Sequence, residues 1–169
     1  MANLQVRRLE PDDWLTMREV RLAALADSPD AFGSTTAREI AFPEAEWRRR
    51  ISSSPPFVAW QGDEPVGLVG VKQVGATNAD EWELIGMWVR PDARGGRVAD
   101  ELVSAVIDAV KAEHADCLTL WVADGNARAR GFYTRFGFEP TGARQVFKRD
   151  DGSQFDEEQL AFPIGSNAA

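Results

Sequence analysis

Apolar and polar residues follow one another along the chain in short runs that are typical of β-strands. Runs such as FVAWQ and CLTLWV are rich in β-branched and aromatic residues. Turn sequences such as GDE and GATNAD separate several of these runs. The pattern predicts strands at 4–10, 57–61, 65–74, 81–89, 117–122, 138–148 and 157–164.

Four other stretches repeat their apolar residues at helical spacing. In the clearest one, Phe132, Tyr133 and Phe136 fall on one helix face, and Gly137 is a typical helix end. The segment 27–42 is interpreted instead as a loop-rich connection without a regular element. The predicted helices are 11–26, 43–52, 96–112 and 127–136. The apolar stripe of the first helix is predicted at Leu15, Leu22 and Leu25.

The order of these elements predicts an α/β (α+β) domain with a mixed sheet. Strands 57–61, 65–74 and 81–89 are joined by short turns, so they form an antiparallel meander. Strands 81–89 and 117–122 are joined by a helix, and such a crossover makes two neighbouring strands parallel. We expect a mostly antiparallel central sheet of about seven strands with about four helices.

Length and composition are those of an ordinary globular protein. A chain of 169 residues is the size of one domain, so we expect a single domain over 1–164 and a flexible tail at 165–169. No stretch approaches the roughly 20 consecutive apolar residues of a membrane span. The first residues show no secretion signal, and the expected location is cytoplasmic.

Charge and the rare reactive residues exclude several kinds of partner. A net charge of −8 argues against binding to nucleic acid or to an anionic membrane, which needs a broad basic face. Cys117 lies in an apolar strand and is expected to be a structural thiol. His114 has no metal-ligand partner at useful spacing, so no metal site is predicted. The sequence leaves the oligomeric state open, a homodimer included.

The segment VRPDARGGRVAD, 89–100, joins a predicted strand to a predicted helix through two adjacent glycines. At such a junction the first amide N–H groups of the helix are unpaired, and the helix dipole adds partial positive charge. Glycine lets an anion approach the backbone without meeting a Cβ atom. The junction is therefore either a pyrophosphate-binding turn or a plain strand-to-helix turn. It lacks the glycine patterns of dinucleotide folds and nucleotide triphosphatases.

Two motifs, taken together, resemble the GNAT superfamily of N-acyltransferases. MWVRPDARGGRVA is similar to its acyl-CoA loop, usually V-x-P-x-x-[QR]-G-x-G-[IV]-[GA]. Further along, NARARGFYTRFGF matches its second signature, N-x-x-A-x-x-x-Y-x-x-x-G-F. The matching positions of the first motif are Val89, Pro91, Arg94, Gly95, Val98 and Ala99. Those of the second are Asn126, Ala129, Tyr133, Gly137 and Phe138.

The resemblance implies a GNAT-type fold that binds acetyl-CoA, or another short acyl-CoA, at a splayed pair of parallel strands. The pyrophosphate would lie on the loop and helix start, with Arg97 standing where the family usually has a second glycine. A bulge at the end of strand 81–89 would offer N–H groups to the thioester carbonyl. The implied acyl-CoA contacts are Met87, Trp88, Val89, Arg94, Gly95, Gly96, Arg97, Val98, Ala99, Asn126 and Tyr133.

The resemblance also implies catalytic roles. Tyr133 would protonate the departing thiolate, or is instead a half-buried core tyrosine. Glu83 is the candidate base for the substrate ammonium, because an even spacing from Val89 puts both side chains on one sheet face. Glu81 shares that face and is the weaker candidate. Asn126 is either a helix N-cap or a pantetheine contact.

The acceptor amine is expected to lie against the segment DAFGSTTARE. There Phe32 would pack an apolar part of the substrate, and Glu39 would attract a cationic one. The predicted function is acetyl transfer from acetyl-CoA to a primary amine of a small molecule or peptide, by direct attack in a ternary complex. The alternative is a non-catalytic acyl-CoA-binding or sensing module on the same fold.

Overall fold

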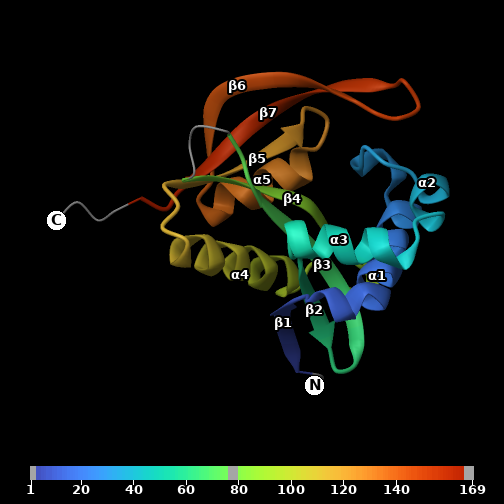
Figure 1. The fold of residues 1–169 in the computed structure, drawn as a ribbon. Helices are drawn as coiled ribbons and strands as arrows, with labels where there is room; N and C mark the ends of the chain where they lie inside the picture. Colours follow the sequence, from blue (N-terminus) through green and yellow to red (C-terminus); the bar gives the residue numbers. More distant parts are fainter. Residues whose placement is uncertain (1–2, 76–79, 166–169) are drawn as a thin grey trace. The chain divides into compact units, whose positions relative to one another are not determined.

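The computed structural model describes residues 3–75 and 80–165 (Figure 1). Two compact units make up the chain, Met1–Val71 with Ile85–Val106, and Lys72–Leu84 with Ile107–Ala169. The expectation of one domain over 1–164 stays a prediction. Of the expected tail, 166–169 lie outside the described residues, as does most of the predicted turn at 75–80.

The first unit contains an antiparallel strand set and the N-terminal helices. Its strands β1 and β2 pair from Leu4 opposite Gln61 to Arg8 opposite Phe57, and β2 pairs antiparallel with β3. The elements are β1 (Leu4–Arg8), α1 (Trp14–Asp27), α2 (Thr36–Ile40), α3 (Glu44–Ser53), β2 (Phe57–Gln61) and β3 (Glu64–Gln73), with short 3-10 turns at Pro11–Asp13, Pro29–Ala31 and Pro91–Ala93.

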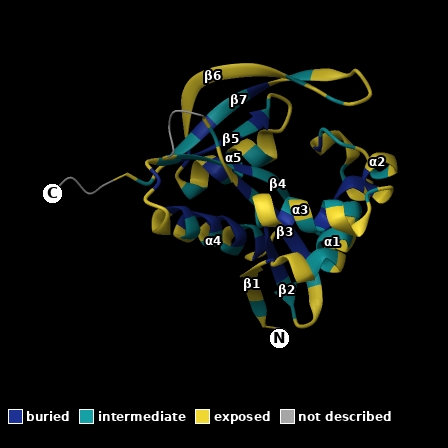
Figure 2. Ribbon diagram, viewed as in Figure 1, coloured by how far each residue is buried: buried dark blue, intermediate teal, exposed yellow. Residues whose placement is uncertain are grey.

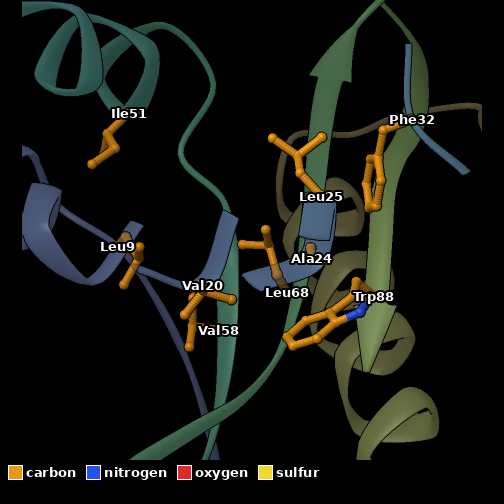
Figure 3. Packing of buried hydrophobic residues seen from close by; sticks show 9 residues of the cluster. All are labelled: Leu9, Val20, Ala24, Leu25, Phe32, Ile51, Val58, Leu68 and Trp88. Atoms are coloured by element: carbon orange, nitrogen blue, oxygen red, sulfur yellow. The ribbon is translucent and has the colours of Figure 1, made fainter. Parts of the chain in front are cut away.

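A continuous apolar core fills this unit (Figure 3). Helix α1 buries Val20, Ala24 and Leu25, which recur at helical spacing. The predicted stripe was therefore partly wrong, because Leu15 is 62% exposed. From α3, Ile51 enters the same core. The core anchors the helices that surround the candidate site.

Helix α2 was missed by the sequence interpretation, which made 27–42 a loop. The Thr35 hydroxyl accepts a hydrogen bond from the Arg38 N–H at 3.2 Å and so caps the start of the helix. The helix is only five residues long. It is too short to show an apolar period, and the capping threonine was its one local signal.

The second unit is a sheet with one amphipathic helix. Strand β4 pairs in parallel with β5 from Glu81 opposite Cys117 to Glu83 opposite Thr119, as the crossover predicted. Strand β7 pairs antiparallel with both β5 and β6, and Figure 1 shows β6 and β7 as a long hairpin. The elements are the first part of β4 (Glu81–Val89), β5 (Cys117–Ala123), α5 (Ala127–Phe136), β6 (Glu139–Lys148) and β7 (Gln154–Pro163). From Ile85 onwards, β4 belongs to the first unit.

Helix α4 (Val98–Ala112) follows β4 and begins two residues later than predicted. Figure 2 shows buried and exposed residues alternating around it, the pattern of an amphipathic helix. The strand order is β1-β2-β3-β4-β5-β7-β6, so the predicted mixed, mostly antiparallel sheet of seven strands is confirmed. Five α-helices, rather than about four, are present in the described ranges. No helix there is long and apolar enough to cross a bilayer.

Helix α4 packs closely on strand β3 at Gly67, which leaves no room for a larger residue there. A Cβ atom at Gly67 would lie 2.9 Å from both Leu102 Cδ1 and Val98 Cγ1. Both side chains are buried, so they have little room to move. We expect Gly67→Ala to lower the free energy of unfolding by about 1–3 kcal/mol in urea titrations.

The matched control is Gly125→Ala, because a Cβ atom there meets nothing within 4 Å. This variant should unfold at the same urea concentration as the unmodified chain or slightly above it. Equal stability of the two variants would contradict the tight contact at Gly67.

Candidate functional site

The junction between β4 and α4 in the first unit has unpaired amide groups at the start of a helix. After the 3-10 turn Pro91–Ala93, the chain turns at Gly95 and enters α4 at Val98. The Glu101 N–H donates to the Arg97 carbonyl at 2.9 Å. The N–H groups at the helix start before Glu101 therefore have no acceptor within the helix, and they can bind an anion.

Only one position of this loop requires glycine. Gly95 has φ of +78°, in the left-handed region that favours glycine, and a Cβ atom there would meet nothing within 4 Å. Among non-glycine residues of the described ranges, only His114 has a positive φ. Arg97 therefore replaces the usual glycine without backbone strain. Its exposed side chain pairs with Glu101 at 2.5 Å.

Asp27 connects this loop to the end of α1 and to β4. Its carboxylate accepts a hydrogen bond from Trp88 Nε1 at 2.9 Å and pairs with Arg94 Nη2 at 2.5 Å. Arg94 Nε also donates to the Val89 carbonyl at 2.9 Å. The Trp88 hydrogen bond, followed by those of Ser28 and Arg94, holds the pKa of Asp27 below its usual value. The sequence interpretation missed Asp27, since nothing in the linear pattern links it to the loop.

Strand β4 breaks its extended conformation at Gly86, where φ is +60°. A left-handed glycine inside a strand is the backbone signature of a β-bulge. The break lies one residue before the predicted range, which began at Met87. It also interrupts the alternation between Glu83 and Val89, so even spacing alone does not place these two side chains on one face.

Two predicted contact residues lie in the core of the first unit. Trp88 is 6% exposed, so only its backbone is available to a ligand at this strand end. Phe32 is equally buried, and the Arg21 guanidinium lies 4.8 Å above its ring. Figure 3 shows both aromatic side chains within the core cluster. Phe32 therefore packs inside the core, and its expected contact with a substrate stays a prediction.

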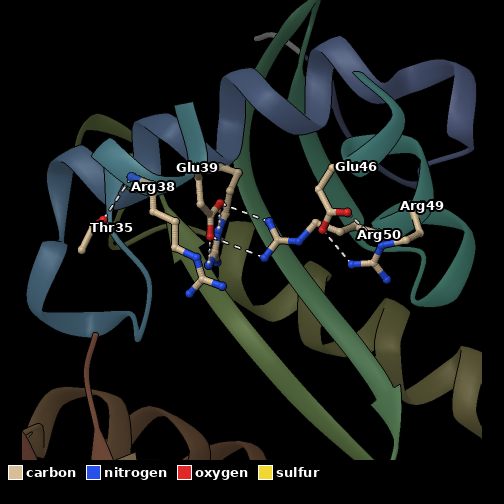
Figure 4. A network of polar contacts seen from close by, with 7 residues as sticks. Thr35, Arg38, Glu39, Glu46, Arg49 and Arg50 are labelled. Carbon is tan, nitrogen blue, oxygen red and sulfur yellow. Dashed lines mark hydrogen bonds and ion pairs between the residues drawn. The ribbon is translucent and has the colours of Figure 1, made fainter. Parts of the chain in front are cut away.

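Glu39 is completely buried between two arginines (Figure 4). Its carboxylate accepts two hydrogen bonds from Arg21 at 3.0 Å and two from Arg50 at 3.2 and 3.5 Å. Burial alone would raise its pKa, but the two guanidinium groups outweigh burial and hold the pKa below its usual value. The charge of Glu39 is therefore already neutralised by the two arginines, and its expected attraction for a cationic substrate stays a prediction.

Beside this network the first unit has a pocket of about 280 Å³. Arg21 of α1 and Arg50 of α3 line it together with Gly86 of β4. The atom Arg21 Nη1 lies 3.5 Å from the position of a Cβ atom at Gly86. The pocket therefore reaches the bulged part of β4.

In the second unit, Tyr133 is buried on α5. It is 7% exposed, with its ring in edge contact with Phe132 and Phe138 at 5.2 and 5.5 Å between centroids. Burial raises the pKa of Tyr133, so the hydroxyl stays protonated at neutral pH. A protonated hydroxyl is what an acid for a thiolate needs.

Two carboxylates of the second unit lie close enough to influence each other. Glu83 lies 3.5 Å from Lys72 Nζ. Glu157 of β7 is 6% exposed and accepts a hydrogen bond from Gln145 at 2.5 Å. Burial, and to a lesser extent the charge of Glu83, raises the pKa of Glu157. The sequence analysis did not identify Glu157, because β7 comes near β4 only through the pairing of both strands with β5.

The remaining candidates have structural contacts. The Asn126 side chain accepts a hydrogen bond from the Ala129 N–H at 3.1 Å and caps α5, as predicted. Glu81 lies opposite Cys117, and burial, with a smaller contribution from Glu81, raises the pKa of that half-buried thiol. His114 is exposed. Within the described ranges, no group of three or more His, Cys, Asp or Glu side chains is arranged to hold a metal ion.

Comparisons with known proteins agree with this fold. Residues 17–138 match the sequence model of the Acetyltransferase (GNAT) family. Mycothiol acetyltransferase of Brachybacterium faecium is 30% identical over 128 residues, which cover 73% of this chain and 37% of that protein. The chain spans less than half the length of the curated relatives that it matches.

Solved structures show the same fold at low identity. A GNAT-family acetyltransferase from Streptococcus pneumoniae gives a TM-score of 0.77 at 17% identity, covering 96% of this chain and 100% of that one. A structure of yncA from Salmonella typhimurium with its cofactor acetyl-CoA gives 0.74 at 17% identity, covering 98% and 96% of the two chains.

The raised pKa of Glu157 has a measurable consequence for stability. Because the folded chain holds this proton more tightly than the unfolded chain, stability falls as pH rises from the usual glutamate range through the raised pKa. Glu157→Gln removes that titration. We expect the variant to gain stability relative to the unmodified chain as the pH rises from the usual glutamate range through the raised pKa, by at most about 1.4 kcal/mol per pH unit.

Chemical denaturation at a series of pH values measures this difference. The exposed Glu139 of β6 serves as control, and Glu139→Gln should keep a constant difference from the unmodified chain over the same range. A constant difference for Glu157→Gln as well would show that burial leaves this carboxyl unchanged.

Proposed function

Since the chain belongs to the acetyltransferase (GNAT) family, we propose that it moves an acetyl group from acetyl-CoA to a primary amine by direct attack in a ternary complex. The observation that carries this proposal is the β4–α4 junction, where the left-handed Gly95 precedes a helix start with unpaired amide groups. In a chain of net charge −8, such local donors are what allow a polyanion to bind.

The pyrophosphate of acetyl-CoA binds the backbone between Gly95 and Ala99 in this proposal. Gly96 and Val98 contribute only their backbone N–H groups, since glycine has no side chain and the Val98 side chain is buried. Arg97 is free to turn from Glu101 to a phosphate, since its side chain is 81% exposed. Arg94 holds the loop against Asp27 and the strand end.

Backbone N–H groups of Met87, Trp88 and Val89 polarise the thioester carbonyl. They follow directly on the bulge at Gly86, which turns the strand out of its regular hydrogen-bonding pattern. One preorganised donor of this kind contributes about 10²–10³ in rate. Asn126 contacts the pantetheine arm in addition to capping α5.

Proton transfers complete the reaction. Tyr133 donates its hydroxyl proton to the departing thiolate of CoA. Glu83 removes a proton from the substrate ammonium, directly or through water, and Glu157 and Glu81 are the alternatives on the same sheet. Glu157 is supported by its burial and its raised pKa, which brings a carboxylate closer to the range of an efficient base.

The proposal also takes the chain to be a single domain over 1–164 in the cytoplasm, as a monomer or a homodimer. It includes no nucleic-acid, membrane or metal partner. The competing function is an acyl-CoA sensor that binds the thioester without transfer.

Release of free CoA thiol tests the proposed function. The protein is incubated with acetyl-CoA and a panel of amino acids, polyamines, aminoglycosides and short peptides. We expect amine-dependent thiol release with at least one class. Binding of acetyl-CoA in calorimetry without release from any amine would establish the sensor instead, and the absence of binding would overturn both functions.

Replacement of Tyr133 tests the proposed acid. Because Tyr133→Phe keeps the buried ring and removes only the hydroxyl, we expect kcat to fall about 10²–10⁴-fold with little change in the affinity for acetyl-CoA. The matched control is Phe132→Leu, which changes a neighbouring ring and keeps the hydroxyl. Turnover that survives in Tyr133→Phe would remove this residue from the acid role.

A further inference from the structure

The pocket of about 280 Å³ beside Gly86 carries a charge that the proposed chemistry does not explain. Arg21 and Arg50 bring two positive charges to it, and Glu39 brings one negative charge. A third arginine at the pocket, Arg49, is already paired with Glu46 at 2.7 Å. One net positive charge therefore remains, in a chain whose total charge is −8.

The two guanidinium groups keep donors available. Arg21 uses Nε and Nη2 for Glu39, which leaves Nη1 next to Gly86. Arg50 uses one hydrogen on each terminal nitrogen, which leaves Nε and the other two hydrogens. A planar fork of this kind suits a carboxylate, which accepts two hydrogen bonds at once.

The surroundings hold these donors in place before any ligand binds. Glu39 is 0% exposed and fixes both arginines from behind, as Figure 4 shows for Arg50. Arg50 also lies 5.2 Å above the ring of Phe42 and 5.7 Å above that of Trp47. Preorganised donors lose little entropy on binding, so they select an anion effectively.

The position of the pocket connects it to the reaction. Ile85 and Gly86 form part of its wall, and the next residue, Met87, begins the strand end proposed to bind the thioester carbonyl. In an α-amino acid a single carbon atom separates the carboxylate from the amine. A carboxylate held beside Gly86 therefore leaves the amine close to that strand end.

We propose that the acceptor is an amine with a neighbouring carboxylate, such as an amino acid, and that Arg21 and Arg50 bind this carboxylate. The proposal rests on the proposed acetyl transfer and names its substrate class. Apolar wall residues such as Met17 and Ile85, which are only partly buried, offer contacts to the rest of the acceptor. A polyamine or an internal lysine of a peptide lacks the anion that neutralises the pocket.

Thiol release with matched acceptors tests the substrate class. Each standard amino acid is compared with its α-carboxamide, which keeps the amine and removes only the negative charge. We expect kcat/KM for the best amino acid to exceed that of its amide by about 10–100-fold. Equal use of both, or a preference for polyamines, would overturn the proposal and leave acetyl transfer intact.

Replacement of Arg50 on α3 tests whether the pocket causes the preference for an amino acid over its amide. Arg50→Gln leaves Glu39 paired with Arg21 and reduces the pocket charge to zero. We expect KM for the amino acid to rise about tenfold or more and the preference over the amide to fall towards one. Arg50→Lys restores the charge and should recover part of the preference.

The matched control is Arg48→Gln on the same helix, because Arg48 pairs with Glu44 and Asp12 and lies outside the pocket wall. The ratio of amino acid to amide is the decisive quantity, since a loss of stability would lower both rates together. An unchanged ratio in Arg50→Gln would overturn the role of this arginine.

A readout without turnover separates this proposal from the proposed function. The N-acetyl amino acids keep the carboxylate, and we expect them to shift the side-chain Nε–H NMR signals of Arg21 and Arg50 but not that of Arg48. N-acetyl amino-acid amides should cause no shift. Shifts without any thiol release would refute the transfer reaction and support the pocket, whereas no shift would overturn the carboxylate site.

Discussion

One carboxylate, that of Asp27, holds together the parts of the first unit on which the proposed acyl-CoA binding depends. It accepts the indole hydrogen bond of Trp88 and pairs with Arg94, which also binds the Val89 carbonyl. The end of α1, the end of β4 and the loop before α4 are thereby fixed to one another. The loop can then make its left-handed turn at Gly95 with the helix amides already oriented, and an anion binds without the entropy cost of ordering the loop.

The buried carboxylate of Glu39 gives the pocket beside Gly86 its character. An isolated carboxylate in a core is costly, so its burial is tolerated only because Arg21 and Arg50 donate to it. The two arginines outnumber it, and the result is a cationic pocket within an acidic protein. Overall charge is therefore a poor guide to the charge of this pocket, because a ligand responds to the local donors that it contacts.

Much of the local geometry of the candidate site was recognisable in the linear pattern, because it depends on residues that are close in the sequence. A glycine-bearing turn before an amphipathic helix, and Asn126 before the next helix, are signals carried within a few residues. Helix α2 was missed because five residues are too few to show a helical period. The even spacing between Glu83 and Val89 did not suffice to place both side chains on one sheet face, because the left-handed residue Gly86 interrupts the alternation along the strand.

The sequence by itself determined the order of the strands and of every α-helix except α2, the parallel pair around the crossover helix and the family motifs, since each depends on residue spacing along the chain. Tertiary structure alone decided the state of every buried charge. Glu39 and Glu157 are residues of a type that is usually exposed, and their burial and their pairing come from partners on other elements. Desolvation and ion pairing act through space, so no pattern of neighbours in the chain can reveal them.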